Sequence, residues 1–371
     1  MDKLKKMLPL MALTLVAATS VVSAVDDMQV RNLENRVSAL EQRRGANGMI
    51  NPPARPVVKD GTDLWIQADV LYMHATEDGV NYGIRQETNS SFIDGQVKNI
   101  SYDWNWGWRA GIGYNLPHDG WDMLLNYTWF RSNESKTSNT DAPESIRQTW
   151  TNPYNTQGAA DALVAHALGR THLKFDYLDF QLGREFFVSK WLTLRPFMGA
   201  RGLWAHRDMT IKYSGGSALG ALQTPLSKLK EKFSNRFRGG GLLAGLDTQW
   251  GLGEGWSFYG QFALSLIYGT QRLHEKQDEY TAAAAVTRIA HVHDSWTIVR
   301  TMTDLGLGLR WDHLFYDDAY RIRFQLGWEQ HILNGFDKDI NLVNSTVQGK
   351  FAFNQGDFAL SGITFQARFD F

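Results

Sequence analysis

The chain contains the stretch Ser361-Gly362-Ile363-Thr364-Phe365-Gln366-Ala367-Arg368-Phe369-Asp370-Phe371, in which apolar and polar residues alternate strictly from Ile363 onward. A period of two places the apolar residues on one face of a β-strand and the polar residues on the other. Taken alone, such a strand fits the last strand of a soluble β-sandwich as well as a strand of a membrane barrel. The rest of the chain has to separate the two folds.

Nine further segments with the same alternation lie upstream, and their side chains favour the membrane. Trp104, Trp106 and Trp108 share one face of a predicted strand, with Arg109 on the other face. A soluble surface would not expose three neighbouring tryptophans, whereas a lipid-facing surface carries belts of aromatic residues. The ten predicted strands lie at 64–72, 102–114, 121–129, 173–188, 192–204, 242–250, 256–268, 305–311, 320–328 and 361–371.

The connections between these segments alternate between short and long. Short turns such as 117–120 and 251–255 follow every second segment, and long loops are expected at 75–100, 132–170, 207–234, 273–297 and 334–357. Outer-membrane barrels have short periplasmic turns and longer extracellular loops. Residues 63–371 are therefore predicted to form an all-β domain, a transmembrane antiparallel up-and-down β-barrel of about ten to twelve strands. The predicted localisation is the bacterial outer membrane, with periplasmic termini.

Two segments depart from the simple pattern. In 173–188 the apolar positions are odd up to Tyr177 and even from Leu178, which predicts a β-bulge near Tyr177. In the longest loop, Ala159 to Leu168 is rich in alanine and leucine and predicts a short helix. Such a helix would either narrow the lumen or lie across the outer mouth.

Three segments are predicted before the barrel. Residues 1–24 have the basic start, apolar run and small-residue ending of a signal peptide. Residues 25–44 have apolar positions at 3-4 spacing, which predicts a short coiled-coil helix, although an amphipathic helix on the same chain gives the same pattern. Such a helix needs partners to be stable, and a homotrimer would supply them. Residues 45–62 form a linker rich in proline and glycine.

Composition excludes several classes of function. The 38 basic and 39 acidic residues give no charge-based case for nucleic acid, and the absence of cysteine excludes disulfides and thiolate sites. No nucleophile motif is present, so no enzyme, metal or cofactor is predicted. His206 with Asp208, and His291 with His293, are the residues nearest to such chemistry.

The polar face of the strands predicts the lining of the lumen. Inward glycines such as Gly113, Gly245 and Gly327 suggest open volume, although glycine also eases strand bending. We weigh an open lumen slightly above a packed one, and the balanced charges predict weak ion selectivity. The predicted pore-lining residues are Arg109, Asp122, Arg195, Arg201, Asp247, Asp304, Arg310, Arg323, Glu329 and Arg368.

The run from Trp104 to Asp122 resembles the Legionella-type major outer membrane protein family, which also occurs in environmental relatives of chlamydiae. The run from Leu182 to Phe197 is similar to the central hairpin of that family. The resemblance implies pore formation in the outer membrane, with surface loops that aid attachment to host cells. Chlamydial proteins of similar role are rich in cysteine, so their disulfide crosslinking is not carried over to this cysteine-free chain.

Two functions from different classes follow. The first is an outer-membrane porin that lets small hydrophilic solutes diffuse passively. The second is a plugged barrel that acts as an adhesin, binding a host-surface receptor through its long extracellular loops. Both need outer-membrane lipid and the barrel-assembly machinery as partners. The closing strand of an outer-membrane barrel carries aromatic residues as its assembly signal, and Phe365, Phe369 and Phe371 match that pattern.

Overall fold

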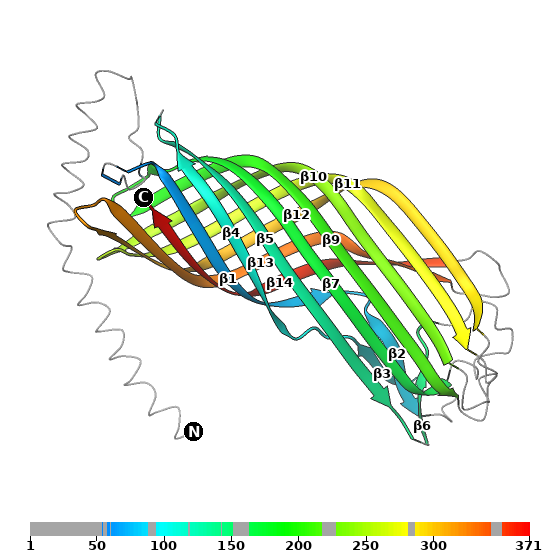
Figure 1. Ribbon diagram of the computed structural model, residues 1–371. Coiled ribbons are helices and arrows are strands. Elements are labelled where there is room, and N and C mark those ends of the chain that lie inside the picture. The colour runs from blue at the N-terminus through cyan, green and yellow to red at the C-terminus, as the bar shows by residue number, and fades with distance from the viewer. Residues whose placement is uncertain are drawn as a thin grey trace, which may run out of the picture.

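In lipid, every backbone hydrogen bond has to be made within the protein. The computed structural model meets this demand with one antiparallel sheet that closes on itself (Figure 1). It describes residues 61–87, 94–117, 119–141, 143–150, 163–216, 228–280, 286–342 and 351–371, together with Ala54, Val58 and Lys59. The predicted signal peptide, the coiled coil and most of the linker lie outside these residues. None of the helices in the described part of the chain is long and apolar enough to cross a membrane.

Ten of the fourteen strands in the described ranges close the ring. Strand β1 pairs with β4 on one side and β14 on the other, and the pairing of β7 with β9 completes the circuit. The ring strands are β1 (Leu64–Glu77), β4 (Trp104–Asn115), β5 (Trp121–Asn139), β7 (Leu163–Arg184), β9 (Leu192–Gly216), β10 (Lys228–Gly253), β11 (Trp256–Tyr280), β12 (Val286–Phe315), β13 (Tyr320–Leu342) and β14 (Phe351–Asp370).

Each of the ten predicted segments lies at one ring strand, so the predicted fold is confirmed. The remaining strands are short: β2 (Asn81–Glu87), β3 (Gly95–Asn99) and β6 (Glu144–Arg147) extend the sheet at the long-loop end, and β8 (Phe186–Phe187) pairs with β9.

The outward face of the ring strands is apolar over about 9–11 residues of each strand, the length that a tilted membrane strand needs. On β10, for example, Leu242 and Trp250 are both exposed, whereas Lys232 and Arg236 further along the same face are charged. The lipid-facing band on this strand therefore runs from about residue 240 to 250.

The strands continue far beyond this band, which corrects the loop predictions. Strand β12 has 30 residues, and most of 207–234 and 273–297 is strand in the described ranges. The polarity of the two faces explains the error. Beyond the membrane the outward residues become polar, and many inward ones, such as Met209, Ile211 and Phe233, are apolar, so the alternation persists there with its faces largely reversed.

Two local predictions are wrong. Residues 163–168 of the predicted helix lie in β7, with Val164 and Ala167 buried. Strand β7 has no bulge at Tyr177, because its register with β5 and β9 runs unbroken through that residue. Leu173, Phe175 and Tyr177 point into the barrel, and Leu178 and Phe180 point out to lipid.

Candidate functional site: the barrel interior

Strand β9 gives the order of the layers inside the barrel. Its inward residues, from the short-turn end upward, are Arg195, Phe197, Gly199, Arg201, Leu203, Ala205, Arg207, Met209, Ile211 and Tyr213. Charged and apolar residues therefore alternate in blocks along the axis. The interior consists of a polar pocket, a layer of ion pairs, an apolar layer, a buried arginine and a second apolar layer.

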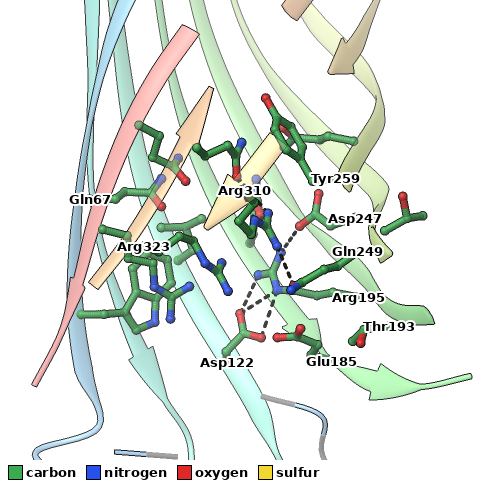
Figure 2. A pocket seen from close by; sticks show the side chains of 18 of the residues that line it. Gln67, Asp122, Glu185, Thr193, Arg195, Asp247, Gln249, Tyr259, Arg310 and Arg323 are labelled. Carbon is green, nitrogen blue, oxygen red and sulfur yellow. Dashed lines mark hydrogen bonds and ion pairs between the residues drawn. The ribbon is translucent and has the colours of Figure 1, made fainter. Parts of the chain in front are cut away.

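The polar pocket lies at the short-turn end and has a cavity of about 90 Å³, which is room for several water molecules. Figure 2 shows Arg195 between two carboxylates, at 2.5 Å from Asp122 and 2.9 Å from Asp247. Arg310 lies beside it and donates to Gln249 and Gln325, with its guanidinium 5.4 Å from the centre of the Tyr259 ring. The pocket is polar and has room for water, but it is narrow.

Above the pocket, two arginines cross the lumen. Arg109 on β4 contacts Asp69 on β1 at 2.9 Å and Glu329 on β13 at 2.7 Å, and β13 is three places away in the ring. Arg201 on β9 contacts Asp179 on β7 and Asp304 on β12, both at 2.6 Å. Each arginine therefore ties together strands on different sides of the barrel.

His331 joins these two arginine clusters. Its Nδ1 atom lies 2.7 Å from Asp304, and its Nε2 atom lies 3.4 Å from Glu329. Tyr177 adds a second link, because its hydroxyl accepts from Arg109 while its ring lies under the Arg201 guanidinium. The lumen at this level holds one continuous charged network, which we call the ion-pair layer.

The next layer is apolar and comes from all sides of the ring. We call it the apolar septum. For example, Phe175 on β7 and Phe358 on β14 have ring centres 5.0 Å apart, and both residues are fully buried. Its residues are Leu71, Met73, Ala75, Tyr102, Phe130, Leu173, Phe175, Tyr177, Leu203, Ala205, Phe237, Ile267, Met302, Leu333, Phe336, Phe358 and Leu360. This layer fills the cross-section, so the expectation of an open lumen is wrong for this conformation.

The inward glycines explain part of that error. A Cβ atom at Gly113 would lie 2.0 Å from the Trp65 ring, and one at Gly245 would lie 2.3 Å from the Phe197 ring. The volume that glycine leaves is therefore occupied by the aromatic ring of a neighbouring strand. Glycine here permits close packing of large side chains in a small barrel.

Arg207 lies above the septum, in the part of the barrel beyond the lipid-facing band. Its side chain is 0% exposed and contacts Asp337, Asp339 at 2.5 Å and Glu77 at 3.7 Å. Burial raises the pKa of Glu77 and of Asp337, while the Arg207 charge lowers it. One guanidinium therefore serves three buried carboxylates.

Two more buried carboxyls lie near this level without a cation. Burial, and after it the charge of Asp339, raises the pKa of Glu275 to about 8. Burial and then the charge of Glu275 hold the pKa of Glu231 well above its usual range. A pKa of about 8 leaves Glu275 largely protonated at neutral pH, and the raised pKa of Glu231 likewise favours its neutral form, which suits the apolar surroundings of both carboxyls among Leu229, Phe233 and Leu273.

All ten residues predicted to line a pore point inward. Arg109, Asp122, Arg195, Asp247, Arg310, Arg323 and Arg368 line the pocket, and Arg201, Asp304 and Glu329 belong to the ion-pair layer. Arg323 and Arg368 are paired with Asp312 and Asp370 at the short-turn end. Their role in a pore remains a prediction.

Sequence reasoning missed Asp69, Asp179, His331 and Arg207 as members of the interior networks. The available signal was the alternation of faces along this strand, continued without a break through Tyr177. It would have placed Asp179, and the residues of β7 that belong to the apolar septum, on the inner face.

The histidines considered for other chemistry lie on the outer face. Asp208 contacts His206 Nε2 at 3.0 Å, and Ser234 Oγ lies 3.4 Å from the same nitrogen. In a serine–histidine–aspartate triad the acid and the serine occupy opposite ring nitrogens, so this is a different arrangement. His291 and His293 are exposed in β12 instead of lying in a loop. Within the described ranges, no three acidic or histidine side chains are placed to hold a metal ion.

Comparisons with solved structures give only distant similarities. The Pseudomonas putida toluene transporter TodX has 8% identity and a TM-score of 0.24, covering 87% of this chain and 93% of that chain. A Pseudomonas aeruginosa FadL homologue has 10% identity and a TM-score of 0.27, covering 83% of this chain and 90% of that chain. TM-scores this low support no conclusion about the function of this chain. No curated protein matches it.

The family comparison is decisive. The family described as Legionella pneumophila major outer membrane protein precursor matches residues 55–371, which include the whole barrel. The match agrees with the resemblance of the 104–122 and 182–197 segments, and with a closed sheet that has an apolar band around it. The chain belongs to the Legionella major outer membrane protein family and is a β-barrel protein of the bacterial outer membrane.

Proposed function

We propose that the protein is an outer-membrane channel for small solutes, and that the apolar septum holds its lumen closed in this conformation. The observation that carries the proposal is the order of layers along the axis. A polar pocket and an ion-pair layer lie below the septum, and the charged Arg207 lies above it, followed by the second apolar layer. Hydrophobic constrictions between polar regions gate channels by excluding water.

The septum is thin. On β9 only two inward residues, Leu203 and Ala205, separate Arg201 from Arg207. Six residues of strand span about 20 Å, or about 14 Å along the axis of a barrel whose strands tilt by about 45°. Small movements of a few aromatic side chains within this layer would connect the polar regions on its two sides.

The solutes that such a channel favours are small and hydrophilic, because the polar pocket and the ion-pair layer line the route below the septum. The ion-pair layer alternates arginines with carboxylates across the lumen, and this mixture of signs supports weak ion selectivity.

The second candidate is the plugged barrel that binds a surface partner. The strand extensions beyond the membrane favour it, because β9 to β12 present long exposed faces above the lipid-facing band. A permanently packed septum would leave these faces as the functional surface.

Conductance in planar bilayers separates the two functions. The double variant Phe175→Ser/Phe358→Ser introduces two hydroxyl groups into the septum. These hydroxyls should let water enter this layer and raise the probability that the channel is open. Phe180→Ser is the matched control, because Phe180 lies on the same strand but faces lipid. Rare openings of the wild type with frequent openings of the septum variant support the channel. Silence of both proteins, each folded and inserted, contradicts it and favours the plugged barrel.

A further inference from the structure

The outward face of the barrel becomes basic just beyond the lipid-facing band. One hydrogen-bonded row places Arg131, Lys174, His206, Arg236 and Arg272 directly opposite one another on β5, β7, β9, β10 and β11. Each of these side chains is exposed or half-buried. Five neighbouring strands therefore carry a basic side chain at the same level.

The next row, with His172, Asp208, Ser234 and His274, has no lysine or arginine, and two further basic rows lie beyond it. Arg170 and Lys232 both lie opposite Thr210, and Lys232 also lies opposite Lys276. One row higher, Lys212 lies opposite Lys230. We call these residues the basic belt: Arg131, Arg170, Lys174, His206, Lys212, Lys230, Lys232, Arg236, Arg272 and Lys276.

Like charges directly opposite one another destabilise a sheet, so the belt calls for a partner of opposite charge. Within the described ranges, Arg131 forms an ion pair with Asp176, His206 with Asp208 and Lys276 with Asp278. The ion pairs found there leave Lys212, Lys230 and Lys232 without a carboxylate. Burial lowers the pKa of Lys212, and the charges of Lys230 and Arg170 lower it further, as expected for crowded cations.

The height of the belt identifies its surroundings. The row immediately below it contains Trp129, Asp176 and Trp204, and tryptophans of this kind lie at the headgroup level of a membrane. Successive rows on one face are two residues, or about 6.6 Å, apart along each strand. On β9 the belt runs from His206, one row above Trp204, to Lys212, four rows above it. It therefore begins at the headgroups and rises about 19 Å beyond the tryptophans along the axis of a barrel whose strands tilt by about 45°. The long connections lie at this end of the barrel, which places the belt at the outer leaflet.

We propose that the basic belt binds the phosphate groups of a multiply phosphorylated lipid of the outer leaflet, whose acyl chains lie on the apolar band below. Charge complementarity supports this partner, because the cations outnumber the acids across five adjacent strands. Continuity supports it as well, since the belt prolongs the face that already contacts lipid. Opposed cations such as Lys212 and Lys230 are separated by the spacing of neighbouring strands, about 5 Å, so one phosphate can contact both.

Native mass spectrometry of the folded full chain in detergent tests the proposal. The probes are diphosphorylated lipid A and the same lipid with both phosphates removed. The wild type should bind the phosphorylated form at least tenfold more tightly. Lys212→Gln/Lys230→Gln should weaken that binding about 30-fold, from the loss of two cations near a lipid surface. Lys98→Gln/Lys190→Gln is the matched control, because Lys98 is half-buried on β3 and Lys190 is exposed in a short turn, both outside the belt, and it should bind like the wild type.

Equal binding of the two lipids, or an unchanged affinity of the belt variant, would overturn the proposal. Competition distinguishes other anions. Displacement of the lipid by millimolar inorganic phosphate would assign the belt to free phosphate. Binding of heparin in preference to lipid would assign it to an anionic polysaccharide. Either result would also overturn the lipid assignment.

Discussion

Replacing Arg207 with methionine should destabilise the barrel by about 3–5 kcal/mol, the usual cost of removing one partner from a buried ion pair. The structure supports the upper part of that range. The Arg207 side chain is fully buried, and the substitution leaves Glu77, Asp337 and Asp339 together without a cation. Tyr102 continues to donate to Glu77, which stabilises only one of the three. The cost should fall at low pH, because the stranded carboxylates take up protons.

Urea unfolding in lipid vesicles, followed by tryptophan fluorescence, measures this cost. Lys190→Met is the control, because Lys190 is exposed in the turn between β8 and β9, and it should change the unfolding free energy by less than about 0.5 kcal/mol. The triple variant Arg207→Met/Asp337→Asn/Asp339→Asn should recover most of the loss, since it removes charges together with their counter-ion. A loss below about 1 kcal/mol for Arg207→Met, with the fold retained, would refute the assignment of Arg207 as the shared counter-ion.

Three further predictions concern pH, lipid and assembly. The pKa of Glu275 is raised to about 8, so the folded protein holds a proton that the unfolded chain releases above about 4.5, and stability should fall as pH rises between these values. Glu275→Gln should reduce that slope by the share of one proton, as unfolding titrations would show, because Glu231, Glu77 and Asp337 also have raised pKa values; an unchanged slope would assign it to those other groups alone. Leu307→Arg, on the lipid-facing band of β12, should cost about 2–4 kcal/mol in bilayers, whereas Thr297→Arg on the same strand, level with the tryptophan row, should cost about 0–1 kcal/mol. Equal costs would mean that the band is misplaced. Phe371→Ser should reduce insertion by the barrel-assembly machinery in cells, with less effect on refolding into detergent; normal insertion would contradict the assembly-signal prediction.

The positions of the ring strands could be predicted from sequence because lipid imposes a simple rule on one face. Trp104, Trp106 and Trp108 have to be apolar and aromatic, since they face lipid. Because every second residue of a strand lies on that face, the sequence shows an alternation of apolar residues with a period of two. Beyond the membrane this rule no longer applies. Lys232 and Arg236 occupy the outward face there, so that face is no longer apolar and the segment resembles a loop.

The interior could not be predicted in the same way, because the lumen of a small barrel accepts both polar and apolar side chains. Phe175 and Tyr177 are apolar on the inner face, and Leu178 and Phe180 are apolar on the outer face. The sequence alone cannot distinguish this from a bulge. The ion pairs depend on register and closure as well. Arg109 and Glu329 are 220 residues apart in sequence, and only the closed ring brings them to 2.7 Å.

The central claim is that the apolar septum alone separates two polar regions of the lumen. The most direct test is single-channel recording of the wild type beside Phe175→Ser/Phe358→Ser, both folded and reconstituted at the same density. The account predicts a mostly closed wild type and a variant with discrete, frequent openings. A wild type that conducts steadily, or a folded variant that stays silent, would contradict it.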